Sequence, residues 1–468
     1  MAEKINVRSP FYTFAEFNNQ LTQAELNLYV YSGTKNTDKG SVKYKLTKST
    51  TTQYYLGGTP VKGIDFEISE LVRDYLDVVF DGTYRDDSSN NFYTNYNKWV
   101  TVEQLFFDNY TDTGNVTSTG TNQLIDSGAS FSPALLNRYA RNEVTKNVSK
   151  ITNVTSTVLT LEDNIFTTTG QAYTVGIKYK TDDYIAYDGY GYFEDGRNPQ
   201  LDQAYLQSNN IIYRLDDHNV RVPISTDKAV SAVFRLNGET IKSQTFTPSD
   251  ESDEQVVYFN VGFNDADTFE QRVKLDGGEI ETTPCLEDYF GSENVGEVDE
   301  IWVSDGDKTD ILKIITEPCS KYEPYKIVFV NKFGVLQDLF FSAKSTQSIN
   351  VTGETYKANT FNNNIIATDL TTGRGHKYYT NKHQYTQYNK LGKESITLNT
   401  GFLSEEYNEV IKQLMLSEQV WMMSTKDEQV YPVVPKTQSL IYKNRVNDKL
   451  VQYVIEFDMA FDKINNIR

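Results

Sequence analysis

Short stretches in which hydrophobic and polar residues alternate recur along most of the chain. Two of them, Leu26 to Tyr31 and Val42 to Leu46, are separated by Ser32-Gly33 and Lys39-Gly40. Alternation with a period of two places the hydrophobic side chains on one face of a strand, and glycines of this kind are typical of turns. The pattern predicts an N-terminal β-sandwich over residues 1–80.

The composition changes between residues 111 and 176, where Thr, Ser, Gly and Asn dominate and aromatic residues become scarce. Several short alternating runs in this segment suit a small antiparallel β-barrel. The flanking sequences are rich in aromatic residues, so they are interpreted as one host domain split by an insertion. This central β domain is expected to comprise residues 81–110 and 177–324.

A C-terminal β domain is expected over residues 325–468. Its most hydrophobic stretch, Tyr325 to Val330, leads through a turn into Leu339-Phe340-Phe341, and this unit should be core. Upstream, Asn237-Gly238 is a strong signal for a hairpin turn because both residues tolerate a positive φ.

Two short helices are predicted. Ser69 would cap the first, from Glu70 to Leu76. The second covers about 404–418, where Ser404 precedes two glutamates and hydrophobic residues follow at helical spacing. These hydrophobic positions are Tyr407, Val410, Ile411 and Leu414. The predicted fold class is thus mainly β, with several β-sandwich or barrel-like domains, an inserted small β-barrel and one or two short helices.

Aromatic content and charge narrow the possible roles. The chain has 33 Tyr and 25 Phe among 468 residues, and tyrosine at this density suits large protein interfaces. Its formal net charge is -19, without a run of Lys or Arg, so specific binding to a phosphate backbone is not expected. No stretch approaches the 18 apolar residues of a membrane helix, and the first ten residues lack the apolar region of a secretion signal. We therefore expect no membrane insertion and synthesis in a cytoplasm.

Signals for catalysis and metal binding are weak. His218, His376 and His383 have no partner residues at zinc-ligand spacing, and phosphate-binding loops and nucleophile elbows do not occur. Asp305, Asp307 and Asp310 lack the rest of a calcium loop and are better explained by a hairpin turn. The sequence predicts a protein that is not an enzyme, with no catalytic residue, cofactor or metal site.

The segment from Tyr187 to Pro199 is the one place where carboxylates and aromatic residues gather between glycines. Two acids beside aromatic rings would suit a sugar-cleaving site. Glycines also allow aromatic side chains to be presented at a crowded junction, and aromatic residues commonly anchor interfaces. We favour the second explanation and predict an inter-domain or inter-subunit contact with Tyr187, Tyr190, Tyr192 and Phe193 as interface candidates.

Several stretches outside the insertion resemble virion structural proteins of crAss-like and related tailed bacteriophages. They are Ile5–Tyr12, Ala186–Gly196 with Asn198-Pro199-Gln200, Val328–Gly334, Thr397–Phe402, and Asn447–Leu450 leading to Ile455–Phe457. The insertion, with Asp126-Ser127-Gly128 and Asp163–Phe166, is similar to a small β module found among phage structural proteins. The resemblance implies assembly into the neck and tail apparatus and implies no activity.

The expected function is therefore a structural subunit that forms a homo-oligomeric ring in the neck or tail connector. Its expected partners are copies of itself, the portal and other ring or tail proteins, with genomic DNA passing through the lumen without specific binding. Its expected location is the virion, assembled in the host bacterial cytoplasm. Two alternatives stay open: a tail-fibre, adhesin or tail-hub subunit that binds host glycans, and a glycan-degrading virion enzyme that uses acids such as Asp188 and Glu194.

Overall fold

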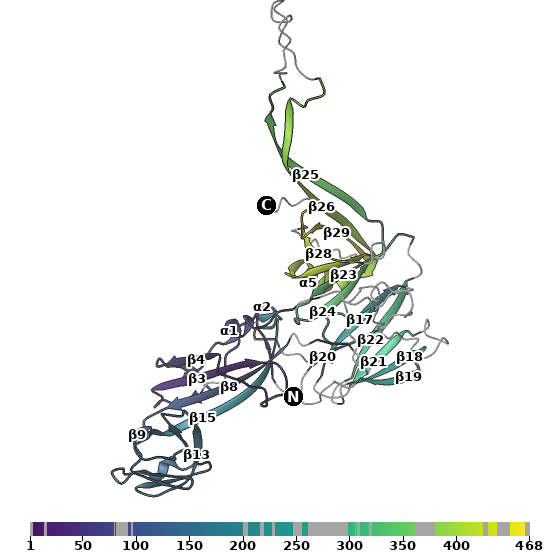
Figure 1. Cartoon of the computed structure of the whole chain (residues 1–468). Helices are drawn as coiled ribbons and strands as arrows, with labels where there is room; N and C mark the ends of the chain where they lie inside the picture. The colour runs from purple at the N-terminus through teal and green to yellow at the C-terminus, as the bar shows by residue number, and fades with distance from the viewer. Residues whose placement is uncertain are drawn as a thin grey trace, which may run out of the picture.

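The computed structural model describes residues 3–13, 16–78, 80, 92–94, 97–199, 205–215, 220–226, 230–246, 255–260, 298–304, 306, 309–317, 321–360, 380–424, 429–437 and 450–463. The fold is mainly β, which confirms the predicted class: most strand pairs are antiparallel, and the helices are few and short. The molecule is elongated, with the inserted module at one end and a two-stranded ribbon projecting from the other (Figure 1).

One large sheet carries the N-terminal part of the chain. Strand β15 pairs with β8, β8 with β3, and β3 with β4, while β1 pairs in parallel with β15. These strands are β1 (Glu3–Asn6), β3 (Gln23–Tyr31), β4 (Tyr44–Lys48), β8 (Lys98–Phe107) and β15 (Ala172–Tyr187). Strands β2 (Glu16–Phe17), β5 (Thr52–Leu56) and β6 (Thr59–Ile64) form a separate small sheet.

This pairing differs from the expected division into domains. The flanks of the insertion, β8 and the second half of β15, belong to the same sheet as β3 and not to a separate central domain. Residue 80 is therefore not a boundary between sheets. Strand signals in a sequence are local, whereas the partner of a strand is set by tertiary packing, and this explains the difference.

Helix α1 (Ser69–Arg73) lies against the N-terminal sheet and buries Val72 in its core. The predicted capping by Ser69 is wrong. Ile68 occupies the N-cap position without a side-chain hydrogen bond, and the Ser69 hydroxyl donates to the Glu67 carboxylate. Ser69 is the first residue of the helix itself, so its hydroxyl does not stand at the position where it would accept a bond from the first helical N–H groups.

The inserted module has a core of its own. Its elements are β9 (Asp112–Asn115), β10 (Ser118–Gly120), β11 (Gln123–Ile125), η1 (Pro133–Leu135), β12 (Tyr139–Asn142), β13 (Val148–Val154), β14 (Val158–Leu161) and the first part of β15. Its strands follow the order β10-β11-β14-β13-β12-β15, with β9 also paired to β15. Within residues 97–199, all of which are described, no ladder joins β9 to β10, so strand pairing alone does not close the expected barrel. Backbone hydrogen bonds between Val116 and residues 170–171 connect the loops on the side of the module between β9 and β10.

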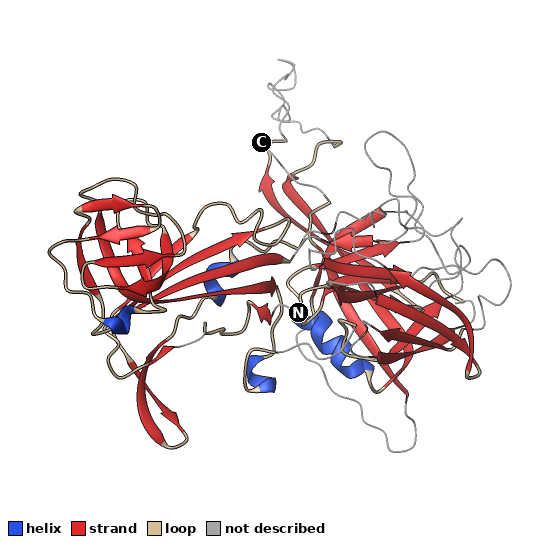
Figure 2. Ribbon diagram, turned by 90° about the horizontal axis from the view of Figure 1, so that it is seen from below, coloured by secondary structure: helices blue, strands red, loops and turns tan. Residues whose placement is uncertain are grey.

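Strand β15 connects the module to the sheet, because it runs through both without interruption (Figure 2). At the transition Gly176 has a φ of +81°, and a Cβ there would lie 2.2 Å from the carbonyl oxygen of Tyr110. The Arg138 side chain donates to Asp108 and to the Gly176 carbonyl, both at 2.8 Å. A glycine is required at this position, and Arg138 fastens the module to the turn that precedes it.

The central part contains two sheets. The first joins β16 (Ile211–Leu215), β22 (Thr309–Glu317), β21 (Glu300–Ser304), β18 (Val230–Leu236) and β19 (Glu239–Phe246), and the second joins β17 (Arg221–Thr226), β20 (Gln255–Asn260) and β7 (Phe92–Thr94). The predicted hairpin at Asn237-Gly238 is confirmed, since it connects β18 to β19 and both residues have positive φ.

The C-terminal sheet has the order β24-β23-β27-β28-β29-β26-β25. Its strands are β23 (Tyr325–Val330), β24 (Leu336–Phe341), β25 (Thr346–Lys357), β26 (Tyr385–Ser404), β27 (Val420–Ser424), β28 (Gln429–Pro435) and β29 (Leu450–Met459). All six residues of β23 are buried, as predicted for this core unit. Helix α5 (Tyr407–Leu416) packs Tyr407, Val410, Ile411 and Leu414 onto the sheet, which confirms the predicted amphipathic helix. However, Ser404 ends β26 and does not cap the helix.

Candidate assembly surfaces

The loop that follows β15 lies where the N-terminal sheet, the central sheets and the C-terminal sheet meet. Tyr187 is only 1% exposed and belongs to a core cluster that also includes Tyr258 and Val328. Gly334 lies so close to this loop that a Cβ would approach the Asp188 nitrogen to 2.5 Å. The Tyr190 amide donates to the Lys332 carbonyl at 2.8 Å. The structure therefore places this loop at a junction within one chain.

Two polar networks fix the loop to the N-terminal segment. Arg8 donates to both carboxylate oxygens of Asp188, at 2.6 and 2.7 Å, and also forms an ion pair of 2.8 Å with Glu418. The hydrogen bond from Arg8 lowers the pKa of Glu418. Two-point contacts of this kind are among the strongest hydrogen bonds in proteins.

Asn198 forms the second network. Its amide nitrogen donates to the carbonyls of Asn6, Ser9 and Pro10 at 3.0, 3.0 and 3.3 Å. Its oxygen accepts from the Asn6 amide at 3.1 Å. The Asn198 side chain is buried, so it replaces water as the partner of the buried Asn6 amide and Ser9 carbonyl.

The four interface candidates take different positions. Tyr187 is in the core, and Tyr190 is half-buried with its hydroxyl oxygen enclosed, so that burial raises its pKa. Phe193 is 96% exposed on α2 (Tyr192–Asp195). The side chain of Tyr192 lies outside the described part. The interface role of these four residues stays a prediction, and the sequence alone could not separate the buried from the exposed aromatic residues.

The two acids considered for glycan cleavage are each held by a cation. Asp188 is paired with Arg8, and Glu194 with Lys412 on α5. The hydrogen bond from Lys412 lowers the pKa of Glu194, which favours the carboxylate and not the protonated acid that a glycosidase needs as a proton donor. This geometry gives structural roles to both acids.

A second surface was missed by the sequence analysis. Strands β25 and β26 form a long antiparallel ribbon that extends away from the body (Figure 1). Every residue of β25 is exposed, and so is most of the first half of β26. We call residues 346–357 and 380–394 the arm. Five large side chains are exposed on it: Ile349, Val351, Tyr356, Tyr385 and Tyr388. The alternation of Ile349 and Val351 with polar residues signals a strand, but no local signal shows that a strand lacks a covering layer.

The arm begins beside a cavity in the C-terminal sheet. The cavity has a volume of about 350 Å³ and is lined on its apolar side by Tyr325, Ile349, Ile396, Met422, Tyr431, Met459 and Phe461. An ion pair of 3.1 Å between Lys463 and Glu394 lies at its rim. Helix α5 covers another part of the same sheet core, so the cavity marks a part that the described residues leave open.

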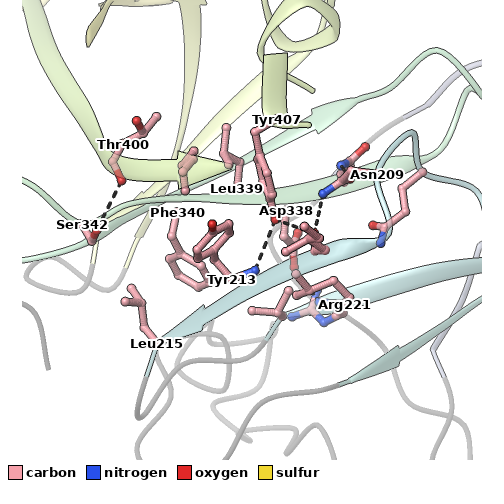
Figure 3. Close-up of a pocket in the computed structure, with 16 residues that line it drawn as sticks. Asn209, Tyr213, Leu215, Arg221, Asp338, Leu339, Phe340, Ser342, Thr400 and Tyr407 are labelled. Carbon is pink, nitrogen blue, oxygen red and sulfur yellow. Dashed lines mark hydrogen bonds between the residues drawn. The ribbon is translucent and has the colours of Figure 1, made fainter. Parts of the chain in front are cut away.

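A smaller space lies between the central sheets and the C-terminal sheet (Figure 3). It measures about 20 Å³, which is room for about one water molecule. The Tyr407 hydroxyl donates to the Ile211 carbonyl at 2.8 Å and accepts from the Tyr213 amide at 3.2 Å. Asp338 accepts from the Arg221 amide at 3.1 Å and is paired with the buried Lys326 at 2.8 Å. These bonds join the two parts and leave no space for a substrate.

The remaining candidate residues do not gather into a site. His383 is exposed in the turn before β26, and Asp310 lies in β22. His218, His376, Asp305 and Asp307 lie outside the described residues. Across the described ranges, no three His, Cys, Asp or Glu side chains lie close enough together to hold a metal ion. In the same ranges, no helix has the length and apolar character required to span a membrane.

Neither a family model nor a curated protein matches this chain.

Proposed function

We propose that this chain is a structural subunit of a tailed-phage virion that forms a homo-oligomeric ring in the neck or tail connector, between portal and tail. The sequence resemblance suggests the setting, and the exposed arm is the observation that carries the proposal. A two-stranded ribbon is at best marginally stable in water. An arm with five exposed large side chains therefore gains its stability when another protein covers it.

The rest of the architecture supports a building block. Several sheets are fixed to one another by buried contacts such as Tyr187 and by charged pairs such as Arg8–Asp188, so the body can hold the arm in a defined direction. A rigid body with a projecting element is what a ring subunit needs to contact its neighbours and the portal. Genomic DNA would pass through the lumen without specific contacts, since the chain is strongly acidic.

We also propose that the role is not enzymatic. The support is the engagement of Asp188 and Glu194 by Arg8 and Lys412. A glycan-binding adhesin finds less support in the aromatic loop, because Tyr187 is in the core and is not available to stack on a sugar.

Electron microscopy of the purified full-length chain tests the proposal. At high protein concentration we expect closed rings, with sixfold or twelvefold symmetry in class averages. Threefold elongated particles would instead indicate a fibre, and particles that remain single at every concentration would contradict the ring. Gold-labelled antibody against the chain should bind the neck of intact phage particles that encode it, and labelling of capsid or fibre tips would place it elsewhere.

A further inference from the structure

One face of the arm continues the core face of the C-terminal sheet. In the ladder, Gln347 lies opposite Ile396, Ile349 opposite Glu394, and Val351 opposite Gly392. Ile396 is fully buried in the sheet core, so these residues lie on the same side as the core. We call this side the inner face of the arm. Ile349 and Val351 are 54% and 60% exposed, because the arm leaves the body before any layer covers them.

The cavity at the base of the arm opens on the same side. Ile349 contributes both to the cavity wall and to the inner face. Gly392 lies beside the same side chains, since a Cβ there would be in ordinary van der Waals contact with the Ile349 Cδ1 at 3.5 Å and the Lys463 Cβ at 3.6 Å. The inner face and the cavity therefore form one continuous surface on which apolar side chains lie beside polar and charged ones.

Charge on the arm is opposite to that of the rest of the chain. The arm holds four lysines, Lys357, Lys382, Lys390 and Lys393, against the glutamates Glu354 and Glu394. The net charge of the arm is +2. Because the whole chain has a formal net charge of -19, the residues outside the arm carry a net charge of -21. Lys393 and Glu394 already have partners at the base, in Asp458 and Lys463. The outer part of the arm thus stays basic on an otherwise acidic molecule.

We propose that the inner face of the arm packs against the acidic body of a second copy of this chain, head to tail. This inference rests on the proposed ring. Two arms would repel each other, so a contact that joins arm to arm across a twofold axis is disfavoured. Contact between an arm and a different, acidic surface is heterologous, and heterologous contacts close into rings when the rotation allows. Charge complementarity therefore selects both the partner and the type of symmetry.

Nucleic acid is a less suitable partner for this surface. Phosphate backbones are bound by positive charge and polar groups, whereas the inner face presents the apolar side chains of Ile349 and Val351. Contact with an apolar protein surface would remove these side chains from water, which lowers the free energy of the complex.

Photo-crosslinking tests the proposal in the full-length chain. A benzophenone amino acid replaces Val351, and a matched sample carries it at Val144, which is 68% exposed on the inserted module. Irradiation of the first sample should give covalent dimers, and mass spectrometry should map the second site to an acidic segment of the body. Dimers should be absent from the Val144 sample. Absence of dimers from the Val351 sample, or a crosslink from one arm to another arm, would overturn the proposal.

A mixing experiment separates the two types of symmetry. The double variant Ile349→Asp, Val351→Asp should lose ring formation, while Val144→Asp should keep it. Because the double variant retains the acidic body, it should still accept one wild-type arm and shorten wild-type assemblies when it is added to them.

If the double variant still forms rings, the inference is wrong and the proposed function survives. If Val351 crosslinks as expected but the wild-type chain forms open fibres, the arm contact stands and the ring fails. Loss of DNA binding as the main effect of the double variant would identify the arm as a nucleic-acid contact instead.

Discussion

At the scale of single residues, the junction between the sheets depends on polar side chains that join distant segments. Asn6 and Asn198 are separated by 192 residues, yet each satisfies backbone groups beside the other. Packing around Tyr187 buries apolar surface at the junction, and the hydrogen bonds of the two asparagines fix the orientation of the joined segments. A buried amide of this type is costly to remove, because several backbone groups depend on it.

Replacement of Asn198 by Ala should destabilise the protein. The change leaves the Asn6 amide without its acceptor and the Ser9 carbonyl without this donor, and unsatisfied buried groups cost about 1–3 kcal/mol each. Urea denaturation should show a lower free energy of unfolding. Asn153→Ala, at an exposed position of β13, is the control and should be nearly neutral. Equal stability of the two variants would contradict the role given to Asn198.

The inserted module should lose stability in acid through Glu143. Burial alone would raise the pKa of this carboxyl, but hydrogen bonds from Lys146, Thr174 and Arg141 outweigh it and lower the pKa to about 2. A carboxylate with a depressed pKa stabilises the fold above its ordinary value of 4.5, and this contribution disappears as the pH falls toward 2. Protection of the amides in β12 and β13 from hydrogen exchange, measured relative to their intrinsic exchange rates at each pH, should therefore decrease over this range. In Glu143→Gln the exchange should already be faster at neutral pH and should change less with pH, and an unchanged pH profile would argue against this residue.

At the scale of elements, strand β15 determines how the insertion is attached. Its first residues pair with β9 and β12 inside the module, and the residues from 178 to 186 pair with β8 in the large sheet. The part of β15 that pairs with β8 forms its own ladder, separate from the part that pairs with β9 and β12. Side chains such as Tyr139 and Ile177 pack across the transition, so the two parts are in contact but keep separate cores.

Deletion of residues 112–176 should leave the large sheet folded. Thr111 lies in the turn after β8 and would be joined directly to Ile177, close to the pairing of Phe106 with Lys178. We expect a β spectrum by circular dichroism and a retained main melting transition. A deletion extended to residue 181 removes four residues of β15 that pair with β8 and should abolish that transition. Insoluble protein from the shorter deletion would show that the module is part of the host fold.

At the scale of the whole molecule, charge is distributed unevenly. The body is strongly acidic and the arm is basic. An acidic body repels DNA at long range, and the repulsion weakens as salt screens it. A genome could pass such a surface without being held.

Duplex DNA should bind the wild-type chain no more tightly than about 10⁻⁴ M at about 150 mM salt. Fluorescence anisotropy with a labelled duplex measures this directly. Lys382→Glu and Lys390→Glu together serve as a control, because any weak binding at low salt should decrease when the arm loses its positive charge. Binding in the micromolar range would contradict the expected passive role toward DNA.

The features that the sequence determined alone are local. The hydrophobic run Tyr325–Val330, the Asn237-Gly238 turn and the helical spacing from Tyr407 to Leu414 each depend on neighbours within a few residues. Only the tertiary structure decided that β8 and β15 join the N-terminal sheet, that Tyr187 is buried while Phe193 is exposed, and that β25 is exposed along its whole length. The physical reason is that strand pairing and burial depend on contacts between segments far apart in the chain, and a local pattern looks the same whichever partner it finds.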